Sequence, residues 1–162
     1  MDQHAIDTEL ADAAELLDAA SSGHLAYTAK DGTPRVVLVG IYWTGEQFVI
    51  STAATAPKVA ALQAHPTVAL AVDAGGTPDQ ARALSVRGRV DVRIVDGVVE
   101  EYLAAARKSM DAEAAAQFEQ NCRDLYDRMA RIAITPTWAR YYDFGAGRVP
   151  KFLQDLAERG GQ

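Results

Sequence analysis

Apolar and polar residues alternate along several short stretches in the first half of the chain, and this period of two predicts β-strands. Three such stretches follow one another: "HLAYTA" (24–29), "PRVVLVGIYW" (34–43) and "QFVIST" (47–52). Asp31-Gly32 and then Gly45 separate them, and these residues are typical of hairpin turns. The chain is therefore predicted to open as an antiparallel meander, to which residues 67–73 and 83–95 add two more strands.

Apolar residues at helical spacing predict four helical regions. We expect them at 8–20, 56–64, 98–129 (broken near Met110-Asp111) and 150–158. Within the third region, one apolar stripe comprises Phe118, Cys122, Leu125 and Met129. After it, "RIAIT" and "WARYYDF" predict the closing strands, on either side of Pro136. No repeat or linker interrupts the chain, so we expect a single domain over residues 1–162, with its barrel at 24–95 and 130–144.

The stretch 34–43 is apolar on both of its faces, unlike an antiparallel strand with one face in water. One face carries Val36, Leu38 and Tyr42, and the other carries Val37, Val39, Ile41 and Trp43. Burial on both faces requires a barrel interior on one side and a helix or a second subunit on the other. A small closed or partly open antiparallel barrel that forms a dimer fits this pattern.

Composition narrows the class of protein. The 162 residues carry a net charge of −6, which argues against a nucleic-acid partner because such proteins normally present a basic face. No apolar run is long enough to cross a bilayer, so we expect a cytoplasmic protein without a membrane partner. The single cysteine, Cys122, and the isolated histidines lack metal-ligand spacing, so we expect no metal site, and Cys122 is predicted to be packed.

The stretch "STAATAPKVAAL" (51–62) is the strongest candidate for binding chemistry. Thr55 is interpreted as a helix N-cap and Pro57 fits the first helical turn. A helix start favours an anion, and Ser51, Thr52 and Lys58 add donors for a phosphate. The alternative interpretation is an ordinary strand-to-helix joint with a solvated lysine.

Two further groups of residues carry alternative interpretations. Arg87 and Arg89 share one strand face, where they either grip an anion or form a solvated face. The last strand places on one face a set that suits either a flat ring system or a dimer interface: Trp138, Arg140, Tyr142 and Phe144. No motif supplies a nucleophile or a metal ligand set, so a cofactor would carry the chemistry of an enzyme, with Tyr42 and Tyr142 as candidate proton donors.

The order of these elements resembles the pyridoxamine 5′-phosphate oxidase-like split-barrel family. The resemblance covers roughly residues 24–95, through "HLAYTAKDGTPRVVLVGIYW", "QFVIST", "APKVAALQAHPTVALAVD" and "SVRGRVDV". Near the C-terminus, "RIAITPTWARYYDF" is similar to the closing strands of actinobacterial members.

The resemblance implies a mainly β fold with helices, in which a six-stranded antiparallel Greek-key split barrel works as a homodimer. It also implies FMN or the deazaflavin coenzyme F420 in a groove between subunits. The cofactor ring would lie along the strand that contains Arg35, Val36, Val37, Leu38 and Val39. Its phosphate would lie at Ser51, Thr52 and Lys58, and Trp138 of the partner chain would help to close the site.

The chain departs from the family pattern in the helix after Pro57. Typical members carry arginines there, whereas this chain carries Ala60, Ala61, Gln63 and Ala64. The sequence therefore supports two hypotheses. The first is an oxidoreductase that transfers hydride between FMN or F420 and a small unsaturated or aromatic acceptor. The alternative is a non-catalytic protein that binds a flavin, haem or another planar ligand.

Overall fold

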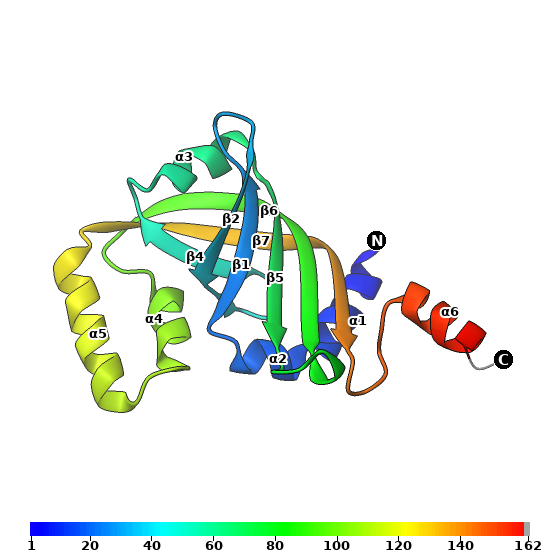
Figure 1. Ribbon diagram of the computed structural model, residues 1–162. Coiled ribbons are helices and arrows are strands. Elements are labelled where there is room, and N and C mark those ends of the chain that lie inside the picture. Colours follow the sequence, from blue (N-terminus) through cyan, green and yellow to red (C-terminus); the bar gives the residue numbers. More distant parts are fainter. Residues whose placement is uncertain (161–162) are drawn as a thin grey trace.

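A computed structural model describes residues 1–160 of the chain, and a single antiparallel sheet forms its centre (Figure 1). The strands follow the order β2-β1-β5-β6-β7-β4-β3 across the sheet. Their bounds are β1 Ser22–Thr28, β2 Pro34–Gly40, β3 Tyr42–Trp43, β4 Phe48–Ala53, β5 Thr67–Ala74, β6 Arg82–Asp96 and β7 Arg128–Asp143. The fold is therefore mixed α+β, as the sequence predicted.

The two edges of the sheet meet at Ile41. Strand β2 ends at Gly40 on one edge and β3 begins at Tyr42 on the opposite edge, so a single residue joins them. The buried Ile41 donates its N–H to the carbonyl oxygen of Ser21 at 3.0 Å, outside the strand ladders. The predicted single strand 34–43 is wrong, because the chain bends here to curl the sheet. This bend makes seven strands where six were expected.

The closing strands form one continuous element rather than two. Strand β7 pairs with β6 along its whole length and passes Pro136 at a bulge, where Arg87 faces Trp138 and Gly88 faces Pro136. A side chain at Gly88 would lie 2.5 Å from Ile134 Cγ2 and 2.7 Å from the Thr135 carbonyl oxygen, so only glycine fits there. The bulge tolerates a proline because one residue leaves the ladder.

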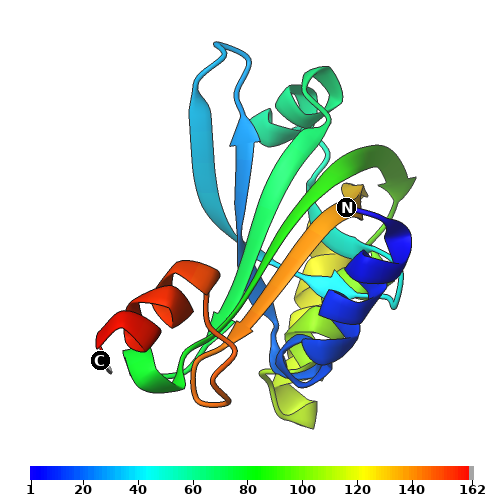
Figure 2. The same ribbon diagram turned by 90° about the vertical axis from the view of Figure 1, so that its right-hand side faces the viewer.

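The N-terminal helix predicted at 8–20 is two helices, α1 (Gln3–Asp12) and α2 (Ala14–Ala19). Helix α1 begins earlier because the Asp2 side chain accepts a hydrogen bond from the Ala5 N–H. Both helices contribute to the barrel core through Ile6, Leu10, Leu16 and Leu17. Figure 2 shows α1 and α2 on one side of the sheet and the C-terminal helix on the other.

The helical region predicted at 98–129 contains α4 (Glu100–Arg107) and α5 (Ala112–Leu125), broken at Asp111 as expected. Asp111 caps α5 by accepting from the Ala114 N–H. Cys122 is buried, as predicted, in a second core cluster with Val49, Leu103 and Met129, and burial raises the pKa of its thiol. The predicted stripe is wrong at its end, because Leu125 is exposed and Met129 belongs to β7.

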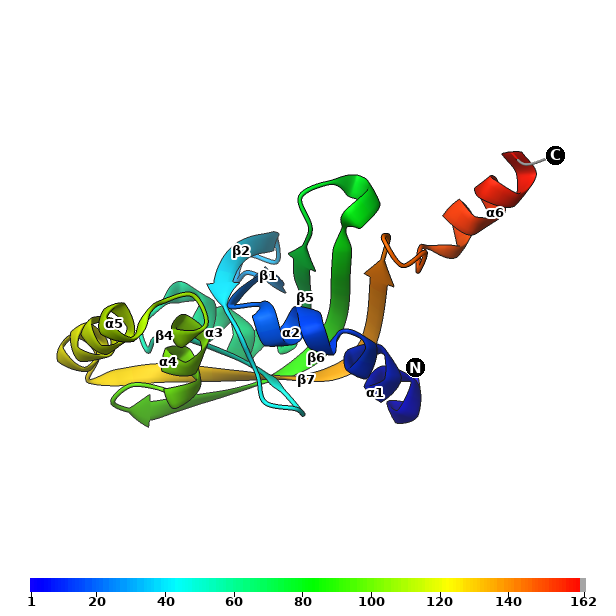
Figure 3. The same cartoon turned by 90° about the horizontal axis from the view of Figure 1, so that it is seen from below.

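Two other helices have different relations to the barrel. Helix α3 (Pro57–Ala64) ends as predicted and begins one residue later than the predicted 56, and it packs Val59 and Leu62 into the barrel core. The tail helix α6 (Lys151–Gly160), predicted at 150–158, buries none of its side chains and projects away from the body (Figure 3). The short 3-10 helix η1 (Pro78–Gln80) lies in the loop between β5 and β6.

Candidate functional site

One face of the strands β2, β1, β5, β6 and β7 is left uncovered by the helices that pack into the barrel. The cross-strand registers place two rows of side chains on it. We call these residues the outer face: Leu38, His24, Ala71, Ser85 and Arg140 in one row, and Val36, Ala26, Ala69, Arg87 and Trp138 in the next. The predicted burial of both faces of 34–43 is therefore not achieved within one chain.

The outer face has an apolar half and a cationic half. On β2, Val36 and Leu38 are each 67% exposed, which is unusual for large aliphatic side chains at neighbouring positions. Alanines continue this apolar half on β1 and β5. Arg87, Arg140 and Trp138 form the cationic and aromatic half on β6 and β7.

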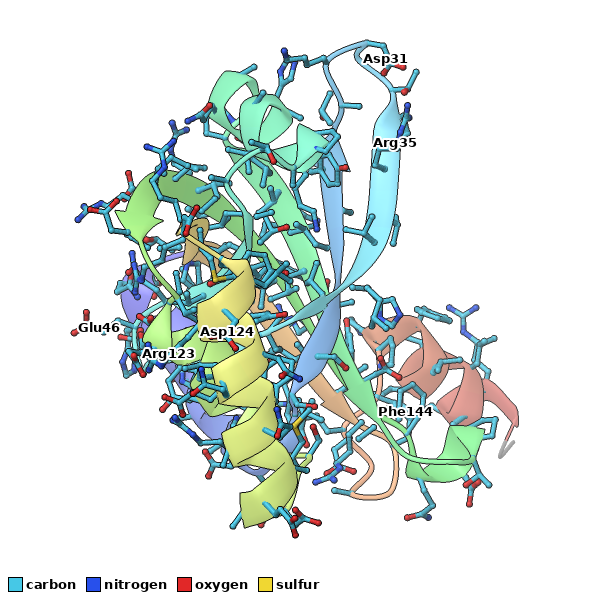
Figure 4. The ribbon with its side chains drawn as sticks, turned by 90° about the vertical axis from the view of Figure 1, so that its left-hand side faces the viewer. Asp31, Arg35, Glu46, Arg123, Asp124 and Phe144 are labelled. Carbon is cyan, nitrogen blue, oxygen red and sulfur yellow. The ribbon has the colours of Figure 1, made fainter. Side chains whose placement is uncertain are left out.

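The five predicted cofactor-binding residues of β2 divide between its two faces. Val36 and Leu38 lie on the outer face, whereas Val39 is buried in the barrel core and Val37 packs against it. Arg35 lies at the tip of the β1–β2 hairpin, where its guanidinium contacts Asp31 at 3.2 Å and Thr33 (Figure 4). Strand β2 pairs only with β1, so its outward backbone groups have no partner strand.

The two predicted hydroxyls of the joint point to opposite faces of β4, because side chains alternate along a strand. Ser51 shares a face with Val49 under α4, and its hydroxyl is buried without a hydrogen-bond partner among the described residues. Thr52 shares the opposite face with Ile50, toward the barrel interior that α3 also enters. The structure therefore does not bring both hydroxyls to one anion through their side chains.

Helix α3 starts without a side-chain cap. The prediction of Thr55 as the N-cap is wrong. The cap residue is Ala56, whose methyl side chain cannot accept a hydrogen bond from the N–H groups of the first turn. Pro57 occupies the first turn as predicted. Lys58 is half-buried and makes no ion pair or side-chain hydrogen bond within residues 1–160, so its charge is available to a ligand.

A further cation lies near this joint that the sequence did not indicate. Residues Ala53 to Thr55 line a pocket of about 370 Å³ together with Leu125 to Arg128. The pairing of Ala53 with Met129 brings these segments together. Arg128 is exposed in this pocket beside Asp127, so the two charges nearly cancel. The position of Arg128 next to the joint follows from the strand pairing and could not be predicted from the sequence.

Trp138 and its neighbours line a second pocket, of about 550 Å³, between β7 and α6. The Arg87 guanidinium lies 4.5 Å from the centroid of the Trp138 ring, a cation–π contact. Three of the four residues predicted to share a face of the last strand, Trp138, Arg140 and Tyr142, line this pocket, whereas Phe144 lies beyond the end of β7. Tyr42 lies elsewhere, on β3, where the Lys108 ammonium sits 5.5 Å from its ring.

The arginines beside this pocket have carboxylate partners. Glu9 of α1 is only 6% exposed, and its carboxylate accepts from Arg140 at 3.1 Å, from Arg148 at 2.7 Å and from the Tyr141 N–H at 2.7 Å. Arg148 also contacts Asp12. These pairs neutralise the two arginines, so they add little attraction for an anion.

Trp138 and β2 lie on the same face but not in the same place. Four inter-strand spacings separate Trp138 from Val36, which is roughly 19 Å along the sheet. A single ligand ring does not span this distance. Within one chain, the structure therefore separates Trp138 from the other predicted cofactor residues.

Other chemistry is sparse in the part of the chain that the structure describes. His24 of the outer face lies 3.8 Å from Asp73, and both side chains are exposed. Over residues 1–160, no group of three or more His, Cys, Asp or Glu side chains is arranged to hold a metal ion. In that same range, none of the helices has the length and apolar character needed to cross a membrane.

Comparison with known proteins places these observations in a family. The family model described as "Pyridoxamine 5'-phosphate oxidase" matches residues 10–143. No curated protein matches the chain. Among solved structures, one described as an F420 reductase is 30% identical, with 77% of this chain and 93% of that chain covered and a TM-score of 0.58.

Two more distant structures share the fold. A conserved hypothetical protein from Mycobacterium tuberculosis is 18% identical, with 93% of this chain and 89% of that chain covered and a TM-score of 0.61. HutZ, described as a heme storage protein from Vibrio cholerae, is 13% identical, with 81% of this chain and 92% of that chain covered and a TM-score of 0.57. The fold is thus shared by proteins with different ligands.

Proposed function

Because the chain belongs to the pyridoxamine 5′-phosphate oxidase family, we propose that it is a homodimeric oxidoreductase with a flavin-type cofactor, FMN or F420. Its reaction is hydride transfer between the bound cofactor and a small unsaturated or aromatic acceptor. The structure described as an F420 reductase supports this class of reaction, since it is the neighbour with the highest identity among those described above.

The observation that carries the proposal is strand β2. It is an edge strand whose outward backbone groups have no partner, and it presents Val36 and Leu38 to the outside. Apolar side chains beside free backbone donors and acceptors are what a flat, heteroaromatic ring system requires, because the ring is hydrophobic on its faces and polar at its edges. Burial of this strand under a ligand and a second subunit removes its exposed apolar surface from water.

The residues at the β4–α3 joint fit the phosphate of such a cofactor. The start of α3 lacks a side-chain cap, Pro57 has no N–H, and the Val59 N–H donates to the Ala56 carbonyl oxygen at 2.9 Å, so the Lys58 N–H is the backbone donor left for an anion. Lys58 has no carboxylate partner among the described residues and adds a charge-assisted bond, while Thr52 lies on the same side of β4 as α3. Arg128 lines the neighbouring pocket together with Asp127, so it adds little net charge to that of Lys58.

When bound, the cofactor supplies a hydride donor or acceptor, which no side chain of this protein offers. The role of the chain is to bind the cofactor, to orient it and to exclude water from the site. Of the two tyrosines considered as proton donors, only Tyr142 lies on the face that would hold the ring, because its strand partner Ala83 continues the outer face. Tyr42 is held against Lys108 instead, so it is not proposed as a donor.

Ligand binding without turnover is the second candidate function. The observation that favours it is the weak phosphate site: α3 carries one cation, Lys58, and no arginine. The outer face also has few titratable groups that could act as an acid or base. HutZ has the same fold and is described as a heme storage protein.

A titration separates the two functions. The purified protein is titrated with FMN, F420 and haem, and quenching of tryptophan or cofactor fluorescence is recorded. We expect saturable binding of FMN or F420, followed by bleaching or recovery of the cofactor band when the reduced complex meets small enones, quinones or nitroaromatic compounds. Tight binding with no oxidation of the reduced cofactor beyond its rate in buffer supports the second function. Absence of binding to all three ligands would refute both.

A further inference from the structure

Helix α6 has an apolar stripe that no other part of residues 1–160 covers. Phe152 and Leu156 are four residues apart and therefore lie on the same side of the helix. They are 63% and 58% exposed, whereas the other large apolar side chains of the helices mostly pack into one of the two cores. A ten-residue helix gains most of its stability from packing, so an unpacked apolar stripe indicates a missing partner.

The base of α6 is held firmly although its stripe is free. Asp143 and Arg148 form a two-residue bridge with backbone bonds of 2.8 and 2.9 Å, and Gly147 turns the chain at a φ of 76°. The Arg148 side chain is then tied to Glu9 and Asp12 of α1. The direction in which α6 leaves the body is thus set before any partner binds, which lowers the entropic cost of docking.

Helix α6 stands beside the cationic half of the outer face. The pocket it shares with β7 is lined by Trp138, Arg140 and Tyr142 on the sheet and by Lys151 and Gln154 on the helix. The apolar half of the face, with Val36 and Leu38, lies at the far edge on β2. The face therefore has a projecting apolar helix at one edge and a flat apolar strand at the other.

Charge decides how two such faces pair. A two-fold axis across the strands would place Arg87 of one copy near Arg87 of the other, and these guanidiniums repel because Arg87 has no carboxylate partner within residues 1–160. A two-fold axis along β5 instead exchanges the edges, so that the cationic half of each copy faces the apolar half of the other. In this arrangement α6 of each copy reaches β2 of its partner, and Trp138 approaches β2 from the opposite subunit.

We propose that α6 is a dimerisation arm whose Phe152 and Leu156 pack on Val36 and Leu38 of a second copy of this chain, walling one side of the cofactor groove. This inference rests on the homodimer of the proposed function. The size of the apolar half supports it: β2, β1 and β5 are seven or eight residues long, about 23 Å, so these three strands cover roughly 330 Å². A stable interface buries about 800 Å² of accessible surface per partner. The arm adds contact area that the flat sheet lacks.

Two double variants test the arm separately from the dimer. Val36→Asp with Leu38→Asp disrupts the sheet face, and Phe152→Asp with Leu156→Asp disrupts only the arm. Sedimentation equilibrium of the full-length protein gives the dimer dissociation constant. We expect wild type to be dimeric, and each double variant to raise the dissociation constant at least 10-fold, because buried apolar anchors dominate interface energies. Leu125→Asp, at a side chain 72% exposed on α5, is the matched control and should leave it unchanged.

A cross-link tests the contact directly. Val36→Cys and Phe152→Cys are combined in one chain and mildly oxidised with diamide. Because these positions lie at opposite edges of the outer face, a disulfide between them must join two chains, and we expect a covalent dimer on a non-reducing gel. The pair Val36→Cys with Leu125→Cys should stay monomeric on that gel.

The outcomes distinguish the two levels of the proposal. If the sheet-face variant dissociates the dimer while the arm variant and the cross-link do not respond, the arm is wrong and the homodimer stands. If wild type sediments as a monomer at every concentration, both are refuted. If both double variants weaken the dimer and the cross-link forms only with Phe152→Cys, the arm is established.

Discussion

Cationic side chains lie both at the joint between β4 and α3 and at the base of α6. Only those at the base of α6 are paired with carboxylates, which come from α1. Lys58 has no ion-pair partner within the described residues. Arg140 and Arg148 share the buried carboxylate of Glu9, and Arg148 also contacts Asp12. Both regions adjoin surfaces that we assign to the ligand and the partner subunit, so their difference indicates a difference in role.

The difference shows which positive charges are structural. A buried carboxylate that accepts three hydrogen bonds fixes α1 against β7 and leaves its arginines nearly neutral to an outside ligand. An unpaired lysine at a helix start lowers the stability of the fold little, because water solvates its charge. Its ammonium group forms an ion pair only when an anion binds. Arg140 and Arg148 are therefore poor candidates for binding an anion, whereas the unpaired Lys58 is the better candidate.

The largest effect is expected at Glu9. Glu9→Ala removes the acceptor of the buried Tyr141 N–H and the partner of two arginines, so we expect a loss of about 2–4 kcal/mol in the free energy of unfolding. Urea denaturation followed by circular dichroism measures it. Glu46→Ala, at an exposed turn residue shown in Figure 4, is the control and should change stability by less than about 0.5 kcal/mol. A Glu9 variant as stable as wild type would show that the network is not structural.

Substitution of Lys58 is expected to change ligand affinity and to leave the free energy of unfolding unchanged, the opposite of what is expected for Glu9. Lys58→Ala should weaken cofactor binding by about 1.5–3 kcal/mol, because it removes a charge-assisted bond to the phosphate. The free energy of unfolding without ligand should stay the same. Fluorescence titration measures the affinity, and Lys30→Ala, an exposed lysine of the β1–β2 hairpin, is the control. Equal affinity in the two variants would remove Lys58 from the site.

A paired cation near the joint sharpens the comparison. Arg131, opposite Ser51 on β7, contacts Glu101 of α4 at 2.5 Å. Burial raises the pKa of Glu101, but hydrogen bonds from Arg131 and from the backbone outweigh it, so the net pKa lies below its ordinary 4.5. A lowered pKa in the folded state stabilises the protein above pH 4.5, and this contribution is lost as pH falls through the folded value.

We therefore expect Glu101→Gln to cost about 1 kcal/mol at pH 7 and to flatten the decline in stability between about pH 5 and pH 3. Denaturation curves at a series of pH values measure this. Glu113→Gln, exposed in the first turn of α5, serves as the comparison variant. Parallel pH profiles for wild type and Glu101→Gln would show that another group causes the acid sensitivity.

The smallest effect is expected at Arg87, whose charge is held by an aromatic ring rather than by a carboxylate. Arg87→Ala should lower stability by about 0.5–1 kcal/mol through the lost cation–π contact with Trp138. It should also change Trp138 fluorescence. Arg89→Ala, two residues along the same strand face, is the matched control. If both variants behave alike, the contact with Trp138 contributes nothing measurable.

Local patterns predicted most of the elements because each depends on neighbouring residues. The hairpin at Asp31-Gly32 and the end of α3 before Pro66 are where turn and proline chemistry place them. The errors occur where distant segments decide. Gly40 and Ile41 bend because two sheet edges must meet, and Met129 joins a strand because it pairs with Ala53 and Val95. Helix α1 begins at Gln3 because Asp2 caps it, a signal that the sequence contains but that the apolar periodicity obscured.

The candidate site divides in the same way. The sequence identified Lys58, the strand at 34–43 and Trp138 as separate features. It did not show that Ser51 and Thr52 face opposite ways, that Arg128 lies beside the joint, or that Glu9 neutralises Arg140 and Arg148. These facts depend on strand register and on contacts between residues as much as 139 positions apart. No local pattern carries them.

By itself, the sequence determined the family and most of the strands and helices, because periodicity, turn residues and element order are local properties that the chain records directly. The tertiary structure alone decided which charges are free and which apolar side chains stay uncovered. Those outcomes follow from the pairing of β4 with β7 and of α1 with β7, which bring together groups far apart in the chain. Lys58 remains available, and Val36, Leu38, Phe152 and Leu156 remain exposed, because no other part of the described residues 1–160 covers them.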